Sequence, residues 1–128
     1  MIILICGLPR AGKTTLSKVY KCKVYHGDYQ LKKCYNVKDD KACVEGLFLN
    51  SSMRERVIKD RTDFKLCIYL DTNMDILNER RYFYSGMECS PPTLDEGWDK
   101  IIIVKDNDYK NAEVIMKDSN LKGDLADG

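Results

Sequence analysis

The chain has 128 residues, which fits one domain and leaves no room for a second. Hydrophobic residues make up 44% of it, enough to bury one ordinary core. The 21 lysine and arginine residues nearly balance the 20 aspartate and glutamate residues, so the net charge of +1 gives no global indication of nucleic acid binding. The apolar run at the N-terminus is too short for a signal peptide or a membrane span, and we expect a cytoplasmic protein without a membrane partner.

The six cysteines are Cys6, Cys22, Cys34, Cys43, Cys67 and Cys89. None forms a C-x-x-C pair, so the sequence indicates neither a zinc site nor a thioredoxin-type motif. Cys6, Cys43 and Cys67 each lie in an apolar run. We therefore expect these three to be small buried hydrophobic residues in a reducing compartment.

Apolar runs and turn residues in the first half of the chain predict strands that alternate with helices. In chain order we expect a strand over residues 1–6, a glycine-rich turn, a helix over 13–20, a strand over 23–26, an apolar run within 41–49 and a helix over 52–60. The pattern Ser52-x-x-Glu55 is typical of a capping box, so Ser52 is the expected N-cap of the last of these helices.

The second half of the chain continues the alternation. We expect a strand over residues 65–70, a helix from Asp71 or Thr72 to about residue 84, a loop at Gly86 and Pro91-Pro92, a strand over 101–104, and a last helix capped by Asn107 or Asp108 and running through 116. The residues after this helix are polar, so we expect a domain over 1–117 and a frayed tail over 118–128. The alternation favours a parallel sheet that is covered on both faces.

The most specific motif follows the first expected strand. The run Gly7-Leu8-Pro9-Arg10-Ala11-Gly12-Lys13-Thr14 matches G-x-x-x-x-G-K-[ST] in full, with a strand before it and a helix after it. This pattern is typical of a P-loop, whose backbone N–H groups and helix N-terminus face the phosphates of ATP or another nucleoside triphosphate. Within the run, Arg10 either contacts phosphate or points into solvent.

The residue types in the motif each have a chemical reason. Gly7 and Gly12 allow the backbone to approach phosphate oxygens where a Cβ would obstruct it. Lys13 can reach between the β- and γ-phosphates and neutralise charge during transfer. Thr14 can ligate Mg²⁺, and Thr15 can hydrogen-bond the α-phosphate. The motif therefore predicts a nucleotide site, but it does not specify a reaction.

Two carboxylates are expected near the carboxyl ends of strands, where doubly wound folds bind ligands. Asp28 could accept the proton of an attacking hydroxyl, or it could be an ordinary aspartate in a surface turn. Glu45 interrupts an apolar run, which is costly without a partner. It could bind magnesium through water or hold the acceptor, or it could be satisfied by backbone or by a lysine. Tyr29 and Lys32 are close to Asp28 in sequence and are expected on the acceptor side.

Other polar residues admit two interpretations each. Arg80 and Arg81 could form a lid over the triphosphate, or they could provide favourable charge at a helix C-terminus. His26 is expected to pack or to hydrogen-bond at a strand end rather than to act as a catalyst. Trp98 is expected to be a core anchor against the fifth strand.

Together, these features resemble those of one family. The P-loop, the strand-end Asp28, the run Val44-Glu45-Gly46-Leu47-Phe48, and Leu70-Asp71-Thr72 followed by Arg80 are similar to the P-loop kinases of the polynucleotide-kinase and zeta-toxin type. The run Pro92-Thr93-Leu94-Asp95-Glu96-Gly97-Trp98-Asp99 is similar to the Pro-x-x-x-Glu-Gly-aromatic-Asp run that leads such kinases into their last core strand. The resemblance spans nearly the whole chain, and the P-loop is its specific part.

The resemblance implies the P-loop NTPase fold, a three-layer α/β sandwich with a five-stranded parallel sheet in the order 2-3-1-4-5. It implies a kinase that uses magnesium and ATP to phosphorylate a hydroxyl, with the 5′-hydroxyl of DNA or RNA as the first expectation. A kinase of nucleosides, nucleotides or other small molecules is the second, and a non-catalytic ATP-binding module is the third. The implied site residues are Lys13 on the phosphates, Thr14 on magnesium, Asp28 as general base, Glu45 near the acceptor, and Arg80 or Arg81 in the lid.

Overall fold

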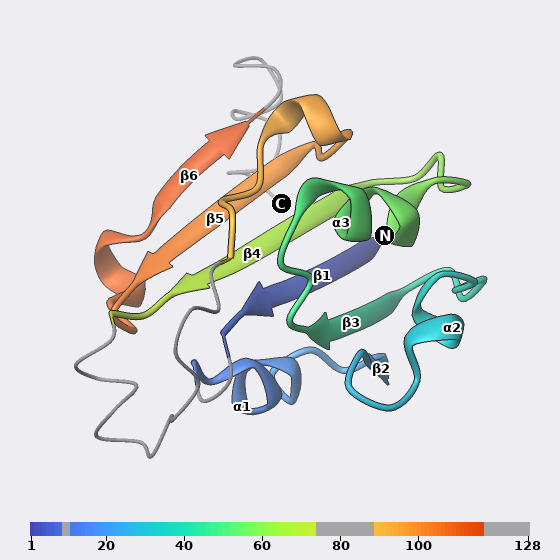
Figure 1. Ribbon diagram of the computed structural model, residues 1–128, viewed down its shortest axis with the longest axis horizontal. Helices are drawn as coiled ribbons and strands as arrows, with labels where there is room; N and C mark the ends of the chain where they lie inside the picture. The colour runs from blue at the N-terminus through green and yellow to red at the C-terminus, as the bar shows by residue number, and fades with distance from the viewer. Residues whose placement is uncertain (9–10, 74–88, 117–128) are drawn as a thin grey trace.

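The computed structural model describes residues 1–8, 11–73 and 89–116. The elements within these ranges are β1 (Ile2–Gly7), α1 (Lys13–Ser17), β2 (Lys23–His26), α2 (Leu31–Cys34), β3 (Ala42–Gly46), α3 (Ser51–Ile58), β4 (Lys65–Asp71), the 3₁₀ turn η1 (Leu94–Glu96), β5 (Lys100–Lys105), the 3₁₀ turn η2 (Tyr109–Asn111) and β6 (Glu113–Met116). The strands form one six-stranded sheet in the order β2-β3-β1-β4-β5-β6 (Figure 1). The chain therefore has an α/β fold with a mostly parallel sheet.

The strand β1 lies inside the sheet, paired in parallel with β3 on one side and with β4 on the other. Its Ile-Ile-Leu-Ile-Cys-Gly sequence is buried along its whole length, as a continuous apolar run predicts for a strand covered on both faces. The pairs β2–β3 and β4–β5 are also parallel, so the five strands from β2 to β5 across the sheet share one direction. Their carboxyl ends consequently meet at one edge.

The prediction of a last helix that runs through residue 116 is wrong. The prediction of a five-stranded, wholly parallel sheet is also wrong. Residues 113–116 form β6, which runs antiparallel to β5 and places Ile115 opposite Ile101. The chain reverses at Asp106 and Asn107, whose φ angles are 51° and 64°. Aspartate and asparagine tolerate this left-handed conformation better than most residues do, so the pair can turn the chain back along β5.

Other expected helix boundaries shift as well. The helix expected over residues 13–20 ends at Ser17, which makes α1 a helix of five residues. Asp108 does act as a cap, but only of η2, where its side chain accepts a hydrogen bond from the backbone N–H of Asn111. The helix expected up to residue 84 falls almost entirely outside the described residues.

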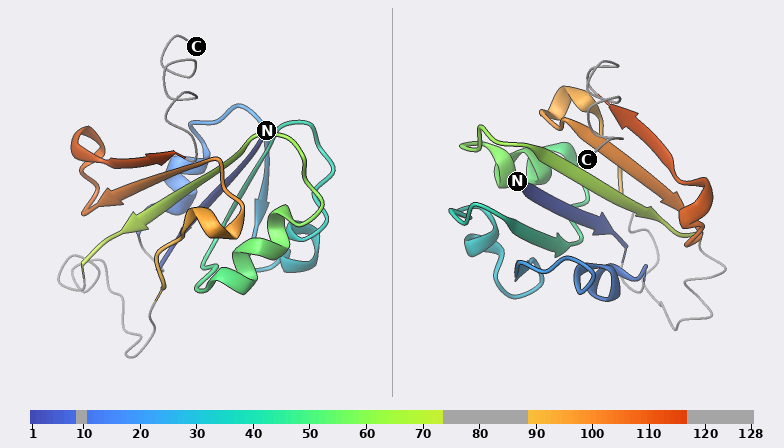
Figure 2. Two further views of the ribbon diagram at one scale, coloured as in Figure 1. Left: turned by 90° about the horizontal axis from the view of Figure 1, so that it is seen from above. Right: turned by 180° about the vertical axis from the view of Figure 1, so that it is seen from behind.

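Helices cover both faces of the sheet (Figure 2). On one face Leu16 of α1 packs against a cluster that includes Ile3, Ile5 and Leu70. On the other face α2 and α3 pack against a second cluster, which contains Val57 of α3. Within residues 1–8, 11–73 and 89–116, the structure contains no helix with the length and apolar character that crossing a membrane requires.

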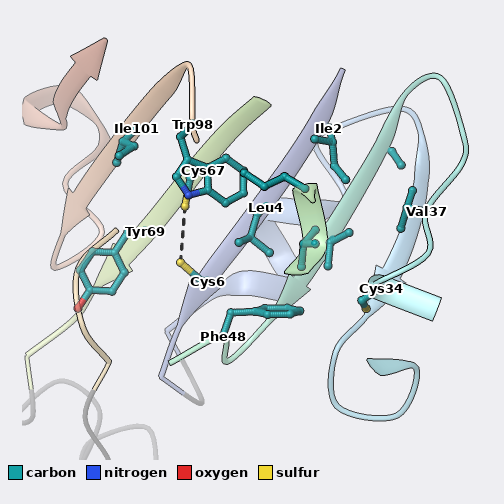
Figure 3. Close-up of a cluster of buried hydrophobic side chains, with 14 residues drawn as sticks. Ile2, Leu4, Cys6, Cys34, Val37, Phe48, Cys67, Tyr69, Trp98 and Ile101 are labelled. Carbon is teal, nitrogen blue, oxygen red and sulfur yellow. Dashed lines mark hydrogen bonds between the residues drawn. The ribbon is translucent and has the colours of Figure 1, made fainter. Parts of the chain in front are cut away.

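The core on the α3 face contains Trp98 and two cysteines in contact (Figure 3). Trp98 is fully buried, which confirms it as a core anchor. Cys6 and Cys67 are also buried, with their sulfur atoms 3.9 Å apart, and this hydrogen bond is the main cause that raises the pKa of Cys6. Burial raises the pKa of Cys34 to about 11 and that of Cys43 to about 12. The expectation of buried thiols is confirmed for Cys6, Cys43 and Cys67.

The helix α3 is joined to η1 by a completely buried arginine that the sequence did not single out. The guanidinium of Arg54 donates to both carboxylate oxygens of Glu96, at 2.8 Å from Nε and 3.0 Å from Nη2. Arg54 Nη1 also donates to the carbonyl oxygen of Phe48 at 2.9 Å. Glu96 accepts two further hydrogen bonds, from Trp98 Nε1 and from the backbone N–H of Thr93. This network fixes the segment that leads into β5.

The N-terminus of α3 is capped by Asn50 and not by the expected Ser52. Asn50 Oδ1 accepts a hydrogen bond from the backbone N–H of Met53 at 3.0 Å, whereas Ser52 lies within the helix. Urea denaturation is therefore expected to show that Asn50→Ala lowers the free energy of unfolding by about 1 kcal/mol. The matched change Ser52→Ala should alter it by less than about 0.5 kcal/mol, and a larger loss there than for Asn50→Ala would contradict the observed cap.

Candidate functional site

The carboxyl ends of β1, β2, β3 and β4 meet at one edge of the sheet (Figure 1). Glu45 of β3 is paired with Ile5 of β1, and Gly7 of β1 is paired with Leu70 of β4. Asp28 follows the end of β2, two residues beyond the residue that pairs with Glu45. Residues far apart in the sequence are therefore neighbours at this edge, where ligands bind in open α/β sheets.

The two glycines of the G-x-x-x-x-G-K-[ST] loop are required for different reasons. A Cβ on Gly7 would lie 2.8 Å from the carbonyl oxygen of Leu70, so β4 packs too closely for any side chain there. Gly12 has a φ of 105°, a left-handed conformation that favours glycine, and it stands directly before α1. Between them, the backbone N–H of Ala11 donates to the carbonyl oxygen of Leu8 at 3.2 Å. Close packing thus explains the glycine at residue 7, and backbone conformation explains the one at residue 12.

The side chain of Lys13 turns back into this loop. Its Nζ donates to the carbonyl oxygens of Gly7 at 2.9 Å and of Leu8 at 2.8 Å, and the side chain is 8% exposed. Burial lowers the pKa of Lys13, while the carboxylates of Glu45 and Asp28 act in the opposite direction. One buried ammonium thus lies within electrostatic range of both expected carboxylates.

Glu45 is buried, and its partner is a residue that the sequence did not pair with it. Glu45 Oε1 lies 2.7 Å from His26 Nδ1, so the carboxylate is satisfied by a histidine on the neighbouring strand and not by a lysine. The ring of His26 also stacks on Tyr29, with centroids 5.2 Å apart and an angle of 19° between planes. The expectation that His26 forms a hydrogen bond at a strand end is confirmed.

The acceptor-side residues expected from the sequence form an open surface beside this group. Asp28, Tyr29 and Lys32 are exposed, and Tyr29 retains 73% of its accessible surface. Together with Gln30, Leu31 and Lys33 they line a hollow of about 620 Å³. A carboxylate, an aromatic ring and two lysine side chains are therefore available to a ligand in one place.

The buried hydroxyl of Thr72, beyond the carboxyl end of β4, is a further feature that the sequence did not reveal. Thr72 follows the last residue of β4 and is 7% exposed, and its Oγ1 has no hydrogen-bond partner in the described part of the chain. The sequence indicated Thr72 as a possible helix cap and as part of the run Leu70-Asp71-Thr72, but gave its hydroxyl no role. Because an unsatisfied buried group is visible only after folding, no sequence pattern could have indicated it.

The types of oxygen atom at this edge are those that magnesium uses when phosphate and water complete its coordination. Magnesium in such sites takes one or two protein oxygens and keeps several waters. Thr14 is an exposed residue of α1, and the buried Glu45 has a second carboxylate oxygen besides the one that contacts His26. Within residues 1–8, 11–73 and 89–116 there is no cluster of three or more histidine, cysteine, aspartate or glutamate side chains suited to holding a metal ion.

Several expected site residues lie outside the described residues, namely Pro9 and Arg10 of the loop and Arg80 and Arg81 of the expected lid. The remaining ones lie at or after the carboxyl ends of β1, β2 and β3: Gly7, Leu8, Ala11, Gly12, Lys13, Thr14, Thr15, Asp28, Tyr29, Lys32 and Glu45. Thr15 is exposed in α1, next to Thr14.

Comparison with protein-family models and with curated proteins finds no match for this chain.

Proposed function

We propose that the chain is an ATP-dependent kinase with a P-loop NTPase fold, and that it transfers the γ-phosphate of ATP to the 5′-hydroxyl of DNA or RNA. One observation carries the proposal: a complete G-x-x-x-x-G-K-[ST] loop stands at the carboxyl end of β1, with its lysine in electrostatic range of Glu45 and Asp28. Phosphoryl transfer to a hydroxyl uses a cation on the phosphates and a carboxylate that accepts the hydroxyl proton, and these residues could supply both.

The loop residues divide the work of binding ATP. Backbone from Gly7 to Thr15 surrounds the phosphates, and the ammonium of Lys13 exchanges its carbonyl partners for oxygens of the β- and γ-phosphates. Lys13 is suited to this exchange because the ammonium is already inside the loop, where burial excludes water. Magnesium, held by Thr14 and through water by Glu45, would supply charge neutralisation to the triphosphate.

Asp28 acts on the hydroxyl. Its carboxylate accepts the proton of the acceptor as the hydroxyl oxygen forms a bond to the γ-phosphorus, while the bond from phosphorus to the β,γ-bridging oxygen breaks and ADP leaves. Asp28 is exposed in the ligand-free protein, so an incoming hydroxyl can reach it without a rearrangement of the core. Arg80 and Arg81, which lie outside the described residues, are the proposed source of further positive charge in the transition state.

The acceptor side favours a nucleic acid end. The exposed ring of Tyr29 stacks on the ring of His26. His26 in turn contacts the buried Glu45. A fixed aromatic face can stack on a nucleobase of any identity, and Lys32 beside it can contact a backbone phosphate. The open hollow around these residues leaves room for a polymer to continue.

Lys13 gives the proposal a pH signature. Burial lowers its pKa below the usual 10.5 in the ligand-free protein, and a bound triphosphate would raise that pKa again. Affinity for ATP is therefore expected to fall as pH rises from the lowered pKa to the pKa in the complex, and binding in that range should take up a proton. Calorimetry in buffers of different ionisation enthalpy measures the uptake. Binding that remains in Lys13→Arg should show no uptake, because arginine stays protonated; uptake in both proteins would exclude Lys13 as its source.

The direct test is transfer of radiolabelled γ-phosphate from magnesium-ATP to separate acceptors. These are 5′-hydroxyl DNA, 5′-hydroxyl RNA, and a panel of nucleosides and nucleotides. Lys13→Ala serves as the inactive variant, and Lys18→Ala, an exposed lysine after α1, serves as its matched control. Label on an oligonucleotide supports the proposal. Label on a small molecule alone would identify that molecule, and not a nucleic acid, as the acceptor. ATP binding without transfer to any acceptor would identify the chain as a non-catalytic binding module.

A further inference from the structure

The hydroxyl of Thr72 occupies a position that needs a physical explanation. Its side chain is 7% exposed, and Oγ1 has no hydrogen-bond partner among the residues that the structure describes. Burial of a hydroxyl without a partner is unfavourable, and native proteins satisfy almost all such groups. An unsatisfied one beside a ligand site indicates a partner that arrives with the ligand.

The direction of Thr72 follows from the alternation of side chains along β4. Leu66, Ile68 and Leu70 belong to the cluster on the α1 face, whereas Cys67 and Tyr69 belong to the cluster on the opposite face. We assign Thr72 to the first series, because it follows directly after β4 and stands two residues beyond Leu70, and side chains two residues apart in extended backbone share a face. It therefore lies on the side of the sheet that carries α1 and the loop before it.

The residue of β4 that packs against the loop is Leu70, two positions before Thr72. Gly7 is paired with Leu70, and a Cβ on Gly7 would lie 3.4 Å from Cβ of Leu70 and 3.5 Å from Cβ of Ala11. Thr72 follows directly after β4, two residues beyond Leu70 and one step further toward the ligand edge. The loop and Thr72 thus border the same space beyond the carboxyl ends of β1 and β4.

The backbone on both sides of Thr72 is held in place. The carbonyl oxygen of Asp71 accepts a hydrogen bond from the backbone N–H of Asp106 at 2.9 Å. The backbone N–H of Asn73 donates to Asp106 Oδ1 at 2.8 Å. A hydroxyl on such a fixed segment has little freedom to find another partner, which makes it a preorganised donor.

We propose that Thr72 Oγ1–H donates a hydrogen bond to a phosphate oxygen of the nucleotide bound by the Gly7–Thr15 loop. The proposal rests on the nucleotide binding proposed above, and it assigns a phosphate contact to a residue outside the loop. The ligand-free protein keeps this donor unsatisfied, and the bound phosphate satisfies it. Thr72 is accordingly a binding residue of the triphosphate and takes no part in moving the proton.

A substitution with valine tests this assignment because two effects of opposite sign are expected. Thr72→Val keeps the shape of the side chain and removes the hydroxyl, so the ligand-free protein should melt several degrees higher. The dissociation constant for magnesium-ATP should rise on the order of 10- to 100-fold, since a hydrogen bond to a charged oxygen is lost. Thr72→Ser should bind ATP nearly as the natural chain does. Thr62→Val, at an exposed threonine between α3 and β4, should change neither quantity.

Magnesium with inorganic triphosphate is the second probe, because it contains the phosphates and lacks the base and ribose. Equal losses of affinity for ATP and for triphosphate in Thr72→Val support the phosphate contact. A loss for ATP alone would place the hydroxyl elsewhere on the nucleotide, and unchanged affinity for both would overturn the assignment while leaving the proposed function intact. If the natural chain binds neither probe, nucleotide binding itself fails and the assignment falls with it. A lower melting temperature of ligand-free Thr72→Val would show that the hydroxyl already has a partner.

Discussion

Asp28→Asn is expected to slow phosphoryl transfer on the order of 10²- to 10⁴-fold, the usual contribution of a general base. Asparagine keeps the size and polarity of the side chain, but it cannot accept the proton of the hydroxyl. Asp28 is exposed, so the change should leave the fold intact. The dissociation constant for magnesium-ATP should change by less than about threefold, because Lys13 and the loop backbone bind the phosphates. Single-turnover transfer assays and calorimetry measure the two quantities separately.

The matched control for this change is Asp40→Asn, an exposed aspartate in the loop before β3, at the opposite edge of the sheet. It removes the same charge from the protein, so a general electrostatic effect would appear in both variants. Transfer should be unaffected in Asp40→Asn. Loss of ATP binding together with transfer in Asp28→Asn would assign Asp28 a structural role, and full activity would exclude it as the base.

Arg54→Leu is expected to lower the free energy of unfolding by about 3 to 5 kcal/mol, because it leaves the buried carboxylate of Glu96 without its counter-ion. Arg54 is 0% exposed, and its guanidinium also satisfies the carbonyl oxygen of Phe48. Burial alone would raise the pKa of Glu96, but hydrogen bonds from Arg54 and Trp98 outweigh it, and the pKa lies below its usual value. The stabilisation by this carboxylate is therefore present at neutral pH and is lost as pH falls below about 4.5 toward the lowered pKa.

Urea denaturation at pH 7 measures the loss, and the same helix provides the control. Arg56→Leu removes an arginine two residues away that is exposed and lies over the ring of Tyr35, so it should cost less than about 1 kcal/mol. The double variant Arg54→Leu with Glu96→Leu should recover part of the stability, since no charge then remains buried. Equal losses in Arg54→Leu and Arg56→Leu would refute a special role for the buried pair.

The strands of the parallel sheet could be predicted because each is a compact apolar run with turn residues at its ends. The run at residues 1–6 and the run at 65–70 differ from β1 and β4 by a residue at most at either end. The prediction of a helix after β5 was wrong, and the reason lies in the local backbone conformation. Asn107 and Asp108 resemble a helix cap in sequence, but the left-handed conformations of Asp106 and Asn107 direct the chain into a turn. Helix and strand patterns over so few residues are hard to distinguish, so the turn decided the outcome.

The site could be predicted only where its residues are consecutive in the sequence or directly follow a predicted strand. The Gly7–Thr14 motif is local, and the position of Asp28 after a strand follows from the alternation. The partners of Glu45 and Arg54 are 19 and 42 residues away in the sequence. No pattern in a single sequence pairs a glutamate with a histidine, or an arginine with a glutamate, over such separations. Contacts of this kind depend on register and packing, which only the folded chain specifies.

The buried thiols allow partial unfolding of the protein to be measured by their chemical modification. Alkylating reagents react with the thiolate form of cysteine. The buried cysteines that are free, with no disulfide bond, are Cys6, Cys34, Cys43 and Cys67. With pKa values near 11 for Cys34 and 12 for Cys43, modification at neutral pH must proceed through molecules in which the surrounding structure has opened. Cys34 lies on α2, while the other three lie on the adjacent strands β3, β1 and β4. Mass spectrometry of alkylation at each position would therefore reveal whether α2 detaches alone or only when the sheet itself separates.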